Sequence, residues 1–162
     1  MVSFMKRKSK AKVFRIFISL SACLVGLFFM FILEVCADAV HDEKVMEEIG
    51  QLVLKRAETM NDYYIGELEY IHAEEILRDF ETGDLLEDDL ENLKVWEHTD
   101  IDTVNDAEIV QVTLMEDNPD FLSASVIVSW NVSGLDGDAV FESTYETKCE
   151  KSGKTLKLSQ FF

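Results

Sequence analysis

The densest group of reactive side chains in the sequence is an acidic stretch over residues 67–91. Its eleven carboxylates, opposed within the stretch by Arg78 alone, are Glu67, Glu69, Glu74, Glu75, Asp79, Glu81, Asp84, Glu87, Asp88, Asp89 and Glu91. A field of this sign repels nucleic acid and anionic lipid headgroups, and it attracts basic proteins or cations. The sequence therefore predicts a solvated helix face suited to a basic protein partner, and it excludes nucleic acid as a partner.

The acidic residues and the histidines do not form a recognisable metal site. Neither Glu87-Asp88-Asp89 nor Asp136-Gly137-Asp138 has the alternating ligands, the glycine and the closing Glu of an EF-hand loop. The three histidines, His41, His72 and His98, are far apart, and none begins a metal-ligand spacing. We therefore expect no metal and no cofactor.

His72 and the tyrosines are the remaining candidates for proton transfer. His72 lies among apolar residues in a helical pattern, which leaves two interpretations: a core or boundary histidine, or a group that faces a cavity between helix and sheet. The tyrosines are predicted to pack with their hydroxyl groups in water: Tyr63, Tyr64, Tyr70 and Tyr145. The sequence has no Gly-x-Ser-x-Gly element, no phosphate-binding loop and no cysteine with a histidine partner. We assign no catalytic residue, and a non-enzymatic protein is favoured.

The tryptophans and the last two phenylalanines are predicted to pack rather than to stack on a ligand. Trp130 shares one side of an alternating pattern with apolar neighbours, as in a sheet core, and Trp96 is given the same interpretation. Phe161 and Phe162 either finish the core or expose one ring to a partner. The glycosylation sequon Asn131-Val132-Ser133 falls in a predicted strand, and we expect it to be a chance occurrence.

The first 35 residues have the composition of a membrane anchor. Residues 1–15 form a basic stub with six positive charges: Lys6, Arg7, Lys8, Lys10, Lys12 and Arg15. Residues 16–33 then carry no charge, and as a helix they would cover about 27 Å, close to the thickness of a bilayer's hydrocarbon core. The positive-inside rule places the stub in the cytoplasm. We therefore predict a single-pass protein of the cell membrane, anchored by residues 16–35, with residues 36–162 as an extracytoplasmic domain.

Two alternatives to a retained anchor remain open. Ala37-Asp38-Ala39 has the form of a signal-peptide cleavage site, so the domain would be secreted if cleavage occurs near Ala39. Residues 20–23 match a bacterial lipobox in composition, but cleavage before Cys23 would leave an apolar N-terminus where lipoproteins have a polar tether. Only Cys149 belongs to the domain, so no disulfide can form within it.

Residues 36–162 have the pattern of an α+β domain. Residues 36–162 hold 9 of the chain's 15 Lys and Arg and 31 of its 32 Asp and Glu, a net charge of -22. Helical periodicity predicts helices over residues 42–60, 64–80 and 84–93, the first two of which could form one helix bent at Asn61-Asp62. Asp84 is expected to cap the third helix, with Glu87 in capping-box position.

Beyond the helices the period changes to two, which predicts about four meandering strands on a curved antiparallel sheet with the helices on one face. Strands are expected over residues 108–114, 122–133, 139–149 and 155–162, joined by turns at 117–120, 134–138 and 151–154. In the first of them, Val110, Val112 and Leu114 are expected to share the apolar side. A weaker pattern over residues 95–104 suggests an additional edge strand.

This order of elements resembles the nuclear transport factor 2-like, or cystatin-like, superfamily over residues 42–162. Residues 141–161 are the most similar part, because many members end in an alternating strand, a Gly-containing turn and a short strand that reads Trp-Lys-Leu. Thr155-Leu156-Lys157-Leu158 departs from that pattern by lacking the Trp. Members with one membrane segment before the domain include components of type IV secretion and conjugation channels and the membrane-docking domain of the mitochondrial import motor. The resemblance carries over no functional residue.

These observations lead to a functional hypothesis and one alternative. The hypothesis is a membrane-anchored, extracytoplasmic protein-interaction domain that serves as an accessory or assembly component of an envelope or secretion complex. The alternative is a small-molecule-binding or isomerase-like domain that uses the cavity between helices and sheet, reached by His72 or a tyrosine.

Overall fold

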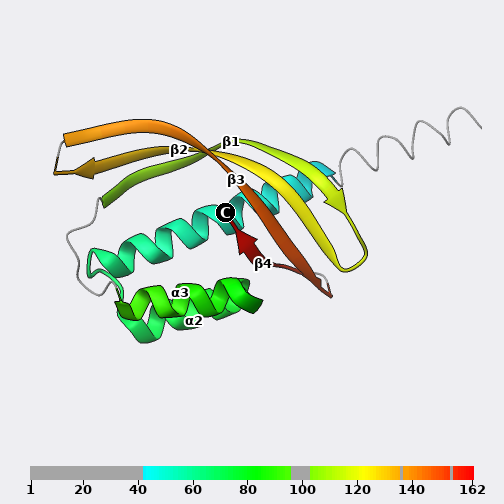
Figure 1. Cartoon of the computed structure of the whole chain (residues 1–162), viewed down its shortest axis with the longest axis horizontal. Helices are drawn as coiled ribbons and strands as arrows, with labels where there is room; N and C mark the ends of the chain where they lie inside the picture. The colour runs from blue at the N-terminus through cyan, green and yellow to red at the C-terminus, as the bar shows by residue number, and fades with distance from the viewer. Residues whose placement is uncertain (1–41, 96–102, 136, 154) are drawn as a thin grey trace, which may run out of the picture. The chain divides into compact units, whose positions relative to one another are not determined.

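A computed structural model describes residues 42–95, 103–135, 137–153 and 155–162. Within these residues three helices pack against a four-stranded antiparallel sheet (Figure 1). The predicted membrane segment lies outside the described residues, and none of the described helices is long and apolar enough to cross a membrane. The expected α+β class, with helices followed by a meander, is confirmed.

The first described helix, called here the long helix, covers residues 42–64. It buries Ile49, Val53 and Met60, as its periodicity predicts. The predicted bend at Asn61-Asp62 is wrong, because the helix runs through both residues. The chain breaks later, at Gly66, whose φ of 80° is a conformation that glycine adopts without strain.

The next two helices are α2 (Tyr70–Phe80) and α3 (Gly83–Val95). A link of two residues joins them, and it is held by β4, because the Thr82 N–H donates to the Leu158 carbonyl at 2.9 Å. α3 begins at Gly83, so Asp84 lies in its first turn rather than at its cap, and the predicted capping box is wrong.

The strands are β1 (Thr103–Asp117), β2 (Phe121–Gly134), β3 (Gly137–Ser152) and β4 (Thr155–Phe161), hydrogen-bonded in that order. The three predicted turns connect them, with Gly137 and Gly153 at positive φ. The expected additional edge strand over residues 95–104 is wrong at Val95 and merges with β1 at its other end. Val95 closes α3, and residues 103 and 104 already belong to β1, while 96–102 lie outside the described residues.

Strand β1 bends through three irregularities in its pairing with β2, at Asn105, Val110 and Met115. Each bulge adds one residue to β1 and increases its local twist. Val110 is therefore turned outward and is 50% exposed, in contrast to its predicted place on the apolar side, while Ile109 and Val112 pack on the core. The bulges help the sheet to arch over the long helix (Figure 1).

The core has two clusters. The first joins the inner side of β2 to the long helix, and Leu122, Ala124, Val126 and Val128 are at most 1% exposed, as their alternation predicts. The second lies among the three helices and contains the buried residues Met60, Tyr63, Ala73, Leu77, Phe80, Leu90 and Leu93. Toward the β2–β3 turn the inner side of the sheet is less covered, since Phe141 is 47% exposed.

Candidate interaction sites

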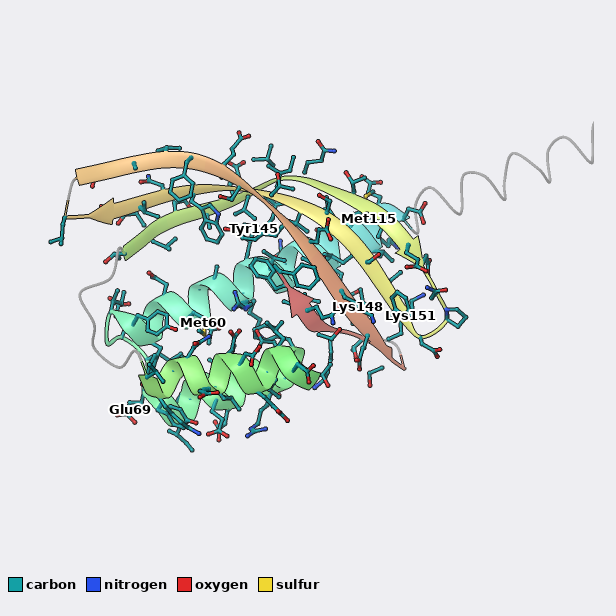
Figure 2. The ribbon with its side chains drawn as sticks, viewed as in Figure 1. Met60, Glu69, Met115, Tyr145, Lys148 and Lys151 are labelled. Carbon is teal, nitrogen blue, oxygen red and sulfur yellow. The ribbon has the colours of Figure 1, made fainter. Side chains whose placement is uncertain are left out.

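The outward sides of α2 and α3 form an acidic layer. Eight of the eleven carboxylates of the acidic stretch are exposed: Glu67, Glu69, Glu75, Asp79, Asp84, Glu87, Asp88 and Glu91. Those on α3 follow one stripe at the i, i+3, i+4, i+7 spacing of a helix face. Glu69 lies at the outer end of this layer (Figure 2).

The basic side chains of the acidic layer have partners of their own. Arg78 donates two hydrogen bonds to Glu74, at 3.0 and 2.6 Å, which holds the pKa of that carboxyl below its usual range. The Lys94 ammonium lies 5.7 Å from the centre of the Tyr70 ring. The eight exposed carboxylates outnumber these two cations, so the layer keeps a net negative field, in agreement with the predicted solvated face.

Glu81 and Asp89, two further members of the stretch, are not on a solvated face. Each is 1% exposed, and both surround Arg56 of the long helix. Arg56 donates a bidentate pair of hydrogen bonds to Asp89, at 2.6 Å from Nε and 2.7 Å from Nη2. The guanidinium also lies over the Phe161 ring, 4.8 Å from its centre. This cluster could not be predicted from the sequence, because no spacing pattern links residue 56 to residues 81 and 89.

Glu81 is the member of this cluster whose carboxyl group lacks a hydrogen-bond partner among the described residues. Its Oε1 lies 3.6 Å from Arg56 Nε. Burial, and then the negative charge of Asp89, raise the pKa of Glu81 to about 8, against a smaller opposing effect of Arg56. At neutral pH Glu81 is therefore mostly protonated, and the cluster is a neutral set of one cation, one anion and one carboxylic acid.

A groove runs along the junction of the long helix and β1. Its larger part is a cleft of about 710 Å³ between residues 51–62 of the helix and residues 104–107 of β1. A smaller hollow of about 360 Å³ continues it between helix residues 43–51 and strand residues 109–112, and Gln51 lines both. The Val104 N–H donates to Asn61 Oδ1 at 2.9 Å, which fastens the helix to the start of β1.

Gly50 sets the depth of the groove at its middle. A Cβ atom at this position would lie 3.3 Å from Ile109 Cγ1, closer than ordinary van der Waals contact. The absence of a side chain lets the helix backbone approach β1 closely at this point.

His72 does not line the groove. It is exposed on α2, so both interpretations of His72, a core or boundary histidine and a group that faces a helix–sheet cavity, are wrong. None of the tyrosines lines the groove either. His41 and His98 lie outside the described residues. The arrangement expected for a proton-transfer enzyme is therefore not formed by these residues. The part of the chain that the structure describes also contains no group of three potential ligands placed to hold a metal ion.

The aromatic residues pack, as predicted. Tyr63, Tyr64 and Tyr70 contribute to the helical cluster, and burial raises the pKa of Tyr64. Tyr145 lies between β3 and the long helix (Figure 2), edge-on to Trp130 at 6.1 Å and stacked on Phe161 at 4.5 Å. The residues Trp130 and Phe161 thus complete the first cluster, whereas Phe162 is 68% exposed. Trp96 lies outside the described residues.

The thiol of Cys149 is buried and forms no disulfide, and its burial makes it unreactive. The residue is 1% exposed, and burial raises the pKa of the thiol to about 12, with a smaller contribution from the charge of Glu48. Because the thiolate is the reactive form, a thiol in this environment is a packing residue rather than a nucleophile.

Comparison with known proteins gives a distant likeness of fold. No model of a known protein family matches the sequence, and no curated protein matches it. The structure is similar to the intermembrane space region of the chloroplast protein ARC6, with a TM-score of 0.44 and 17% identity over 72% of this chain and 94% of that one. It is also similar to a de novo designed β-sheet protein, with a TM-score of 0.38 and 17% identity over 72% and 88% of the two chains. Neither likeness assigns a family.

Proposed function

We propose that this chain is a protein-interaction domain, held at the membrane, that binds a basic surface of a partner protein through the acidic layer of α2 and α3. The observation that carries this proposal is the excess of negative charge on the layer, where eight carboxylates are exposed against the two cations Arg78 and Lys94. Charges arranged in this way steer a partner of opposite charge and select against acidic partners and nucleic acid.

The location proposed for the domain comes from the sequence. Residues 1–15 are the cytoplasmic stub, 16–35 the anchor and 36–162 the extracytoplasmic domain. The mature N-terminus tests this division, since a retained anchor leaves residues 1–35 in the membrane fraction. A mature chain that begins near Ala39 would replace the anchored protein by a secreted one.

The proposed superfamily and the proposed role in a complex rest on the order of helices and strands. Helices followed by a four-stranded meander support a place in the nuclear transport factor 2-like, or cystatin-like, superfamily. An anchored member without a catalytic constellation is suited to work as an accessory or assembly component of an envelope or secretion complex.

Co-purification from native membranes tests the interaction. The full chain, extracted in a neutral detergent, is compared with a triple variant of α3, Glu87→Gln, Asp88→Asn and Glu91→Gln. Removal of three exposed charges is expected to lower recovery of the partner about tenfold, at about 0.5 kcal/mol for each charge.

A matched triple variant of β3 controls for total charge. Glu142→Gln, Glu146→Gln and Glu150→Gln remove the same charge from exposed positions of the sheet and should leave recovery unchanged. Equal losses in both variants would mean non-specific attraction. A wild-type chain that recovers no partner would count directly against the proposal.

A further inference from the structure

The groove between the long helix and β1 carries the same sign of charge as the acidic layer, on a separate surface. Its lining carboxylates are Glu43, Glu47, Glu58, Asp62 and Asp106. Among the described residues that line it, the basic one is Lys55, and its ammonium lies over the Phe80 ring, 4.6 Å from the ring centre. The groove is thus negative along its length, and its cation is directed to a contact with α2.

Apolar side chains lie between these charges. Leu54, Ala57 and Val104 line the larger cleft, and Met46 and Val110 line the smaller hollow. A ligand that fits this lining combines basic groups with apolar ones. A free metal ion or a small polyamine would leave the apolar part unused.

The length and the edge of the groove favour an extended ligand. Helix residues 43 and 62 are about 28 Å apart along the axis, a distance that eight or nine residues of extended chain cover at about 3.3 Å each. β1 is the outer strand of the sheet, and no strand of the described residues pairs with its free edge, where Asn61 takes the Val104 N–H. The bulges at Asn105 and Val110 interrupt that edge, so backbone pairing alone would hold a strand weakly there.

From these features we infer that the groove binds an extended segment of a partner protein, about eight or nine residues long, in which Lys or Arg alternates with apolar side chains. The basic groups meet Glu47, Glu58 and Asp106, and the apolar groups rest on Leu54 and Val104. This inference rests on the proposed function, that the domain binds a basic protein partner, and it assigns that partner a second contact, at the junction of the long helix and β1.

Peptide binding to the full chain in a neutral detergent tests the inference. The probe is a fluorescent, end-blocked ten-residue peptide of alternating Lys and Val, and its binding is measured by anisotropy. A groove triple variant, Glu47→Gln, Glu58→Gln and Asp106→Asn, is expected to weaken binding about tenfold. Ala57→Trp, which fills the cleft without a change of charge, is expected to weaken it by a similar factor.

Three controls separate the possible results. The Glu-Val counterpart of the peptide should not bind, and a Lys-Ser peptide should bind more weakly than the Lys-Val probe. The α3 triple variant, which removes the same charge from the acidic layer, should change the affinity less than about twofold. Circular dichroism of every variant confirms that the domain is folded.

Each other outcome overturns the groove assignment. Loss of binding in the α3 triple variant but not in the groove variants would leave the proposed function standing and locate the probe on the acidic layer. Equal losses in all variants, or no binding of the probe, would refute the groove, and the co-purification would still decide the proposed function. A dimer that disappears in the groove variants would mean that a second copy of the chain is the occupant.

Discussion

Replacement of Glu81 by Gln should make the domain more stable at neutral pH, although it alters a fully buried residue. Glutamine is a neutral isostere of the protonated carboxyl, so it keeps the shape of the Arg56, Asp89 and Glu81 cluster and removes the titration. In the unfolded chain Glu81 ionises at its ordinary pKa of 4.5, whereas in the fold the pKa is about 8.

The magnitude follows from proton linkage. Between pH 4.5 and 8 the folded chain holds a proton on Glu81 that the unfolded chain has lost, so the contribution of Glu81 to stability is full below pH 4.5 and decreases as the pH rises through 8. At about 1.36 kcal/mol for each pH unit, the interval from 4.5 to 7 amounts to about 3 kcal/mol. Glu81→Gln should therefore equal the wild type near pH 4.5 and exceed it by about 3 kcal/mol at pH 7.

Urea denaturation followed by tryptophan fluorescence, at pH values from 4.5 to 9, measures this difference. The control is Glu75→Gln, an exposed position on α2, which should leave the pH dependence unchanged. If Glu81→Gln is less stable than the wild type at pH 7, and the difference is constant across the range, Glu81 is ionised in the fold and the reasoning is refuted.

Three other changes test the packing of the domain. Asp89→Ala should lower the free energy of unfolding at pH 7 by about 2 kcal/mol, less than the usual cost of breaking a buried pair, because Glu81 can then ionise against the guanidinium; an unchanged urea midpoint would contradict this. Gly50→Leu should cost about 2 kcal/mol in the same assay despite leucine's better helix propensity, because the new side chain meets Ile109. The thiol of Cys149, in a variant without the other two cysteines, should stay unreactive toward a disulfide reagent at pH 8 until urea unfolds the domain.

Local patterns carried enough information to predict much of the fold. The alternation through Leu122, Ala124, Val126 and Val128 depends only on the two-residue period of a strand, and all four residues are buried. The turns at Pro119, Gly137 and Gly153 depend on backbone conformations that few other residues adopt, and these predictions are confirmed as well. The irregularities of β1 were not predictable, because a bulge depends on the partner strand and not on the sequence of one strand.

The sequence by itself determined the class of the domain, its order of helices and strands and its negative charge, because these follow from composition and from periodicity within each element. The tertiary structure alone decided which carboxylates are surface charges and which are buried. Glu81 and Asp89 belong to the same acidic run as Glu87 and Glu91, yet both contact Arg56, which lies far away in the sequence on the long helix. Contacts between residues so distant in sequence are fixed only by the packing of the whole domain. The groove along β1 has the same origin, since helix and strand residues come together there across more than forty positions of the chain.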